Sequence, residues 1–167
     1  AGEFQGTANW DGSSLTSLPD PETLGPTMDV VVVSYSATGD LLWVQQGASD
    51  HTDRAIDVVS DPQGNIYVAG QFSDTITFDV EHLNAMYNAT FLLKLDPAGN
   101  EQWFRRCGGA IYDHVRDMLF TPNGELLLTR DLQGNMIFLD GSVDGMQKTM
   151  KQMMGMNKMM GDNAAGM

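Results

Sequence analysis

Short runs of apolar and β-branched residues recur along the chain, and a polar turn separates the two runs of each pair. The clearest turn is Asp61-Pro-Gln-Gly-Asn, which is followed by the strand-like segment Ile-Tyr-Val. Pro62 fixes φ for a type I turn, and Gly64 supplies the positive φ that closes a bulged hairpin loop. The same turn chemistry predicts four hairpins, with strands over 29–35 and 41–46, 55–60 and 65–72, 90–95 and 101–106, and 115–120 and 126–130.

The chain also matches itself at an offset of 60 residues, so that residues 28–78 align with 88–138 without a gap. Residues 1–15 form a partial third copy at an offset of 68, and the extra residues fall in the Pro-rich loop around Pro19 and Pro21. The identical pairs fall on turn and core positions: Gly39 and Gly99, Trp43 and Trp103, Asp53 and Asp113, Asp57 and Asp117, Pro62 and Pro122, and Gly64 and Gly124.

A 60-residue unit with four short strands has the size and strand number of a β-propeller blade. The sequence therefore predicts an all-β propeller segment over residues 1–139, with one complete four-stranded blade from Arg54 to Arg106 between two half-blades. A closed propeller needs about 4–8 blades. We expect a piece of a longer propeller, or a chain whose exposed strand edges bind further blades, a partner protein or its own copies as a homo-oligomer.

The repeated polar and aromatic residues have a structural interpretation. We expect Asp53, Asp57, Asp113 and Asp117 to accept main-chain N–H groups in the loops between blades. A cation site is the alternative for these aspartates, although the chain contains no Asp-x-Asp-x-Asp-Gly calcium loop. Trp43 and Trp103 are expected to pack between blades.

The segment Met-Asp-Val-Val-Val-Val-Ser-Tyr-Ser-Ala-Thr-Gly-Asp-Leu-Leu-Trp, followed by Asp53-Arg54-Ala55 and Asp-Pro-Gln-Gly-Asn-Ile-Tyr-Val-Ala-Gly, resembles the SBBP-type β-propeller repeat. The likeness covers residues 1–138 and weakens over 88–138, where Arg130 replaces the glycine found at Gly70. This resemblance implies a non-enzymatic scaffold or binding module, extracellular or on a bacterial cell surface. The Gly-x-x-x-Trp spacing is also similar to quinoprotein propellers, and the alternative is part of such an enzyme with a cofactor in its channel.

Residues 140–167 depart from the repeat and are rich in methionine. On a helix, the thioethers would share one broad face opposite Lys148, Lys151 and Lys158. Such a face could bind an apolar partner or Cu(I), which prefers soft ligands, or it could cover a blade edge. No other cofactor is expected, and the residues of this face are Met146, Met150, Met153, Met154, Met156 and Met160.

Composition narrows the classes of function further. A net charge of −13 argues against binding nucleic acid or anionic membranes, and no apolar stretch is long enough to span a bilayer. The single Cys107 excludes an internal disulfide, and His51, His82 and His114 share no metal-ligand spacing. No Gly-x-Ser-x-Gly elbow, P-loop or His-Glu-x-x-His motif is present, so the sequence predicts no enzyme. The start lacks both an initiator Met and a signal peptide, and we expect it to be processed or truncated.

Overall fold

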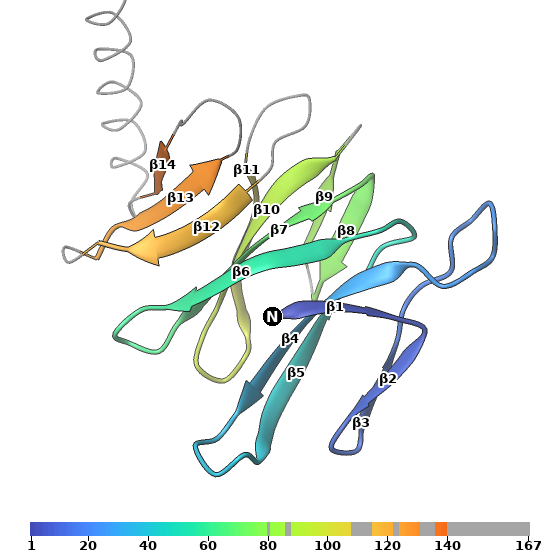
Figure 1. Cartoon of the computed structure of the whole chain (residues 1–167), viewed down its shortest axis with the longest axis horizontal. Coiled ribbons are helices and arrows are strands. Elements are labelled where there is room, and N and C mark those ends of the chain that lie inside the picture. The colour runs from blue at the N-terminus through green and yellow to red at the C-terminus, as the bar shows by residue number, and fades with distance from the viewer. Residues whose placement is uncertain (80, 86–87, 108–114, 122–123, 131–135, 140–167) are drawn as a thin grey trace, which may run out of the picture.

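The computed structural model describes residues 1–79, 81–85, 88–107, 115–121, 124–130 and 136–139. Within these ranges every regular element is a β-strand, and the strands form three larger sheets and two small hairpins. The all-β, propeller-like fold that the repeat predicts is confirmed, although the three sheets do not close into a ring (Figure 1). The described residues include no helix that is long and apolar enough to cross a membrane.

The central sheet is the predicted complete blade. Its four strands are antiparallel in the order β11-β10-β7-β6. They comprise β6 (Arg54–Ser60), β7 (Ile66–Phe72), β10 (Ala89–Leu95) and β11 (Glu101–Cys107). The strand boundaries agree with the sequence prediction to within one residue because the turns that separate the strands are specified locally.

Each flanking sheet has a third strand in addition to its predicted hairpin. The first sheet joins β1 (Gly2–Gln5) to the hairpin of β4 (Met28–Tyr35) and β5 (Leu41–Gly47). The third sheet joins β14 (Met136–Leu139) to the hairpin of β12 (Val115–Phe120) and β13 (Leu126–Arg130). β1 pairs with the distant β4, whereas β14 pairs with β13, the strand that precedes it in the chain, and the turns of the four predicted hairpins reveal neither pairing.

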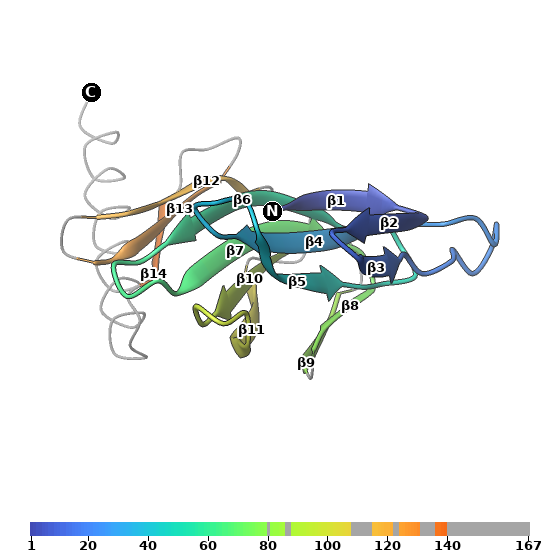
Figure 2. The same cartoon turned by 90° about the horizontal axis from the view of Figure 1, so that it is seen from below.

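Two small hairpins follow the second strand of a blade, and the sequence patterns did not predict them. The first pairs β2 (Thr7–Trp10) with β3 (Ser13–Thr16), and the second pairs β8 (Thr75–Phe78) with β9 (Glu81–Asn84). Thr7 lies opposite Thr16, and Thr75 lies opposite Asn84, so the two hairpins match at the offset of 68. Figure 2 shows β8 and β9 projecting from the body of the sheets.

Two apolar cores hold the three sheets face to face. The core between the first and second sheets contains Val30 and Val32 of β4 and a set of rings that includes Phe78 and Phe91. The core between the second and third sheets includes Leu92, Met118 and Leu128. Because neighbouring strand residues point to opposite faces, β10 contributes Phe91, Leu93 and Leu95 to the first core and Leu92 to the second.

Candidate functional site: the hairpin end of the blades

The two ends of the blades differ in how closely they follow the repeat. The tight turns after β4, β6, β10 and β12 form one end, named here the turn end. The turn after β6 packs on the turn after β10, where an added Cβ at Gly64 would lie 3.3 Å from Pro97. The other end, named here the hairpin end, comprises the hairpins β2–β3 and β8–β9, the loop 48–53 between β5 and β6, and the turn 73–74 after β7.

The four turns of the turn end share one hydrogen-bonding pattern. In each turn the glycine N–H donates to the carbonyl of the first turn residue, and the first and fifth residues are also bonded. The four glycines have φ values of 90°, 83°, 87° and 82° at Gly39, Gly64, Gly99 and Gly124. Pro62 occupies the second position of its turn, and Pro122 lies outside the described residues. This end is therefore occupied by repeated, structural residues.

The two repeated tryptophans lie at contacts that hold the blades. Trp43 donates its indole N–H to the carbonyl of Pro97 at 3.1 Å and packs against Gly99, so it joins the first sheet to the second. Trp103 packs on the core between the second and third sheets, with its ring 5.9 Å from that of Tyr67.

Asp57 connects the second sheet to the third. It follows a bulge in β6, and its Oδ2 accepts the main-chain N–H of Met118 at 2.6 Å. Asp117 follows the corresponding bulge in β12 and is exposed. Asp113, the repeat equivalent of Asp53, lies outside the described residues. So do His114 and the whole methionine tail, including Met146, Met150, Met153, Met154, Met156 and Met160.

The loop 48–53 is fixed at both ends by hydrogen bonds to neighbouring segments. Ala48 exchanges two main-chain hydrogen bonds with Thr77 of β8, at 2.9 and 3.0 Å. The Ser49 hydroxyl accepts the N–H of His51 and donates to the carbonyl of the same residue, each at 3.0 Å. The loop therefore presents the side chains of Asp50 and His51 on a hydrogen-bonded turn.

Asp53 is the last residue of the loop 48–53, and its side chain lies in the interior of the protein. The residue is fully buried, and its Oδ1 accepts the N–H of Ser73 at 3.3 Å, whereas its Oδ2 has no hydrogen-bond partner among the described residues. Burial raises the pKa of Asp53 to about 7, because a buried carboxylate loses its hydration. Burial also raises the pKa of Asp29, which is fully buried nearby and accepts the side-chain N–H of Gln46 at 2.6 Å.

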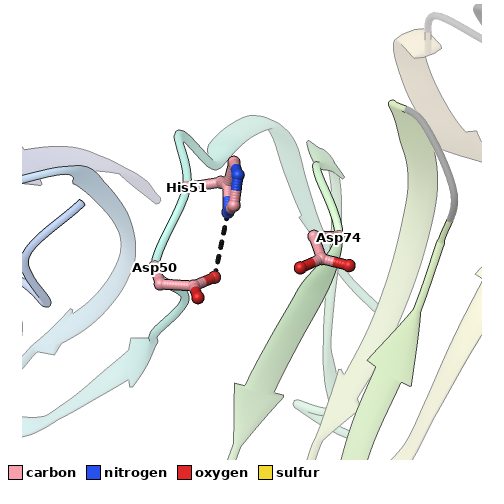
Figure 3. Close-up of side chains that lie close together, drawn as sticks. All are labelled: Asp50, His51 and Asp74. Atoms are coloured by element: carbon pink, nitrogen blue, oxygen red, sulfur yellow. Dashed lines mark hydrogen bonds and ion pairs between the residues drawn. The ribbon is translucent and has the colours of Figure 1, made fainter. Parts of the chain in front are cut away.

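Asp50, His51 and Asp74 form a cluster of ligand-type side chains at the hairpin end (Figure 3). One side-chain atom from each residue lies within 4.8 Å of the other two. His51 Nδ1 is 2.9 Å from Asp50 Oδ1, and this hydrogen bond raises the pKa of His51 above its ordinary value. Two carboxylates and one imidazole are donors that suit a divalent ion such as Zn²⁺ or Mn²⁺, so the cluster could hold a cation of this type.

The sequence did not identify this cluster because Asp74 reaches His51 only through the fold. His51 shares no metal-ligand spacing with the other histidines in the sequence, and Asp74 lies at the turn after β7. A local signal existed in the repeat, where Asp74 corresponds to Gly6. Both adopt positive φ, 63° at Asp74 and 72° at Gly6, so a carboxylate occupies a position where the equivalent hairpin has glycine.

The remaining candidate residues that the structure describes, His82 and Cys107, are not part of the cluster. His82 is exposed on β9. Cys107 is a half-buried thiol at the end of β11 that packs against the core between the second and third sheets.

Comparison with known proteins gives a distant similarity but shows no family. No protein-family model matches the chain. An uncharacterized WD repeat-containing protein, L264 of Acanthamoeba polyphaga mimivirus, is 24% identical over 115 residues, which cover 60% of this chain. The match spans only 8% of that protein. The similarity supports a propeller-like repeat, and nothing in it is specific to the SBBP type.

Proposed function

We propose that this chain is part of a non-enzymatic β-propeller scaffold that binds a partner protein at its hairpin end. The observation that carries the proposal is the division of the residues between the two ends. The repeated glycines, tryptophans and Asp57 hold turns and blades together, whereas Asp50, His51 and Asp74 break the repeat and lie at the surface. Repeat scaffolds place binding residues in loops that a rigid core positions.

The similarity to a WD repeat-containing protein supports an interaction scaffold, because propellers of this kind commonly present their loops to other proteins. The resemblance to SBBP-type repeats adds the location that we propose, outside the cell or on a bacterial surface. Fold analogy names no ligand, so the partner has to be identified by experiment.

The test places a photoreactive amino acid at one end of the blades or the other in the full chain. Thr52 is exposed in the loop 48–53, and Gln63 is exposed in the turn after β6, so the two positions lie at opposite ends of that strand. After irradiation of source cells that express each variant, we expect a discrete protein crosslink from position 52. Position 63 is the matched control and should give none.

Equal labelling from both positions, or none from either, would contradict binding at the hairpin end. The enzyme alternative makes a different prediction, because a quinoprotein-type propeller should retain a coloured cofactor on purification. An absorption spectrum of the chain purified from its source therefore separates these two classes.

A further inference from the structure

Asp50, His51 and Asp74 occupy positions at which the next copy of the repeat has no ligand-type side chain. The equivalent residues at the offset of 60 are Ala110, Ile111 and Gly134. The repeat is therefore built without carboxylates or an imidazole at these positions, and the three side chains have no role in the repeat pattern itself.

The three side chains come from two separate segments and lie close together (Figure 3). Asp50 and His51 belong to the loop 48–53, and Asp74 belongs to the turn after β7. One ligand atom of each lies within 4.8 Å of the other two, and His51 Nδ1 is 2.9 Å from Asp50 Oδ1. Two ligand atoms bound to one tetrahedral Zn²⁺ are about 3.3 Å apart, so small side-chain rotations bring all three onto one ion.

The cluster is also open to solvent. The side chains of His51 and Asp50 are 42% and 47% exposed, and Asp74 is exposed. An ion can therefore reach the cluster without unfolding of the chain. Three protein ligands leave the fourth position of a tetrahedral zinc site for water or another small donor.

The charge around the cluster favours a cation. The hairpins β2–β3 and β8–β9, the loop 48–53 and the turn 73–74 contain no lysine or arginine, so no ammonium or guanidinium of these segments balances their carboxylates. An imidazole among the ligands favours Zn²⁺ over Mg²⁺ and Ca²⁺, which prefer oxygen ligands.

A buried carboxylate beside the cluster gives a second, independent indication. Asp53 is fully buried, and its Oδ1 accepts the N–H of Ser73, so it connects the loop that carries His51 to the turn that carries Asp74. Its Oδ2 has no hydrogen-bond partner among the described residues, and Asp53 interacts electrostatically with His51. A buried carboxylate without full hydrogen bonding is costly, and a cation bound by the adjacent residues offsets part of this cost.

We propose that Asp50, His51 and Asp74 bind one Zn²⁺ ion, which joins the loop 48–53 to the turn after β7 and leaves one coordination position open to solvent. Each aspartate supplies a carboxylate oxygen, and neutral His51 supplies a ring nitrogen. Bonds to the ion replace the hydrogen bond between His51 and Asp50. This inference goes beyond the proposed scaffold function and requires no partner protein.

The test is calorimetric titration of the full chain, purified without a histidine tag, with zinc chloride. We expect one ion per chain. His51→Asn and Asp74→Gly should each weaken binding at least about tenfold, because the loss of even an outer partner of a metal ligand costs about 10–100-fold in affinity. Glycine suits position 74 because φ is 63° there, as it suits Gly6 at the equivalent position.

The chain offers a matched control for each ligand type. His82 is an exposed histidine on β9, and Asp117 is an exposed aspartate on β12. His82→Asn and Asp117→Asn should bind zinc as the parent chain does. Excess Mg²⁺ or Ca²⁺ should leave the zinc isotherm unchanged, since neither ion favours an imidazole ligand.

Urea denaturation gives a second readout that also shows whether the variants fold. Without metal, His51→Asn and Asp74→Gly should change the unfolding equilibrium constant less than about threefold, because both side chains lie at the surface. At a free zinc concentration one hundred times the dissociation constant, this constant should fall about a hundredfold in the parent chain and the two controls. It should fall far less in the two ligand variants.

Three results would overturn the proposal. The first is no zinc uptake by the parent chain, and the second is uptake that either ligand variant leaves unchanged, which would place the ion elsewhere. The third is displacement of zinc by an equal concentration of Ca²⁺, which would indicate only a generally acidic surface. Zinc uptake is measured on the purified chain and partner binding by crosslinking in source cells, so either can fail while the other stands.

Discussion

Asp57→Ala should weaken the contact between the second and third sheets in the chain as it stands. The substitution removes the acceptor of a 2.6 Å hydrogen bond from the N–H of Met118, a residue that is only 3% exposed. A hydrogen bond to a charged acceptor contributes about 1.5–3 kcal/mol, and the Met118 N–H that loses its acceptor has little access to water. We therefore expect the free energy of unfolding to fall by about 2 kcal/mol.

Asp117→Ala is the matched control because it changes the same residue type at the equivalent strand position. Its carboxylate is exposed and accepts no hydrogen bond within the part of the chain that the structure describes. A substitution of this kind should change the stability by less than about 0.5 kcal/mol.

Urea denaturation of both variants measures the difference. The midpoint should fall for Asp57→Ala while the slope of free energy against urea stays constant, because the exposed surface on unfolding is unchanged. Hydrogen exchange adds a local readout, since the Met118 amide should exchange faster in Asp57→Ala alone. Equal effects of the two substitutions, or an unchanged Met118 exchange rate in Asp57→Ala, would refute the view that this bond joins the sheets.

Three further predictions concern the hairpin end and the blade core. Burial raises the pKa of Asp53 to about 7, so its contribution to stability is fully present below about pH 4 and is lost as the pH rises to about 7. The free energy of unfolding should therefore fall between pH 4 and 8, and Asp53→Asn should remove up to about 4 kcal/mol of this pH dependence in urea denaturation. An unchanged pH profile would contradict the burial argument. The pKa of His51, followed by NMR titration, should lie above its ordinary value and fall in Asp50→Asn, because the Asp50 hydrogen bond is the largest cause of the shift; no fall would exclude that cause. Gly70→Ala should destabilise the chain by at least about 1–3 kcal/mol, because the new Cβ would lie 2.2 Å from the carbonyl oxygen of Arg54. Thermal melts of both variants measure the difference: Gly2→Ala, at the equivalent position of the first sheet with no atom within 4 Å, should be nearly neutral.

The sequence alone determined the hairpins and the blade that they build. Each turn is specified by its own residues, a polar first residue and a glycine with positive φ, as at Asp61 and Gly64. Because this information is local and repeats every 60 residues, it also predicted the strand boundaries and a four-stranded sheet from Arg54 to Arg106. Alternation along β10 then required two cores, one on each face of the central sheet.

Only the tertiary structure decided where residues distant in sequence meet. The third strand β1 depends on pairing with the distant β4, and the hydrogen bond that the Met118 N–H donates to Asp57 depends on how two sheets stack. The cluster of His51 and Asp74 forms because the loop before β6 and the turn after β7 end on the same side of one sheet. Local chemistry sets each turn and each strand, whereas the packing of faces sets the contacts between them. The candidate binding surface depends on contacts between segments and not on local chemistry, and for that reason the sequence did not predict it.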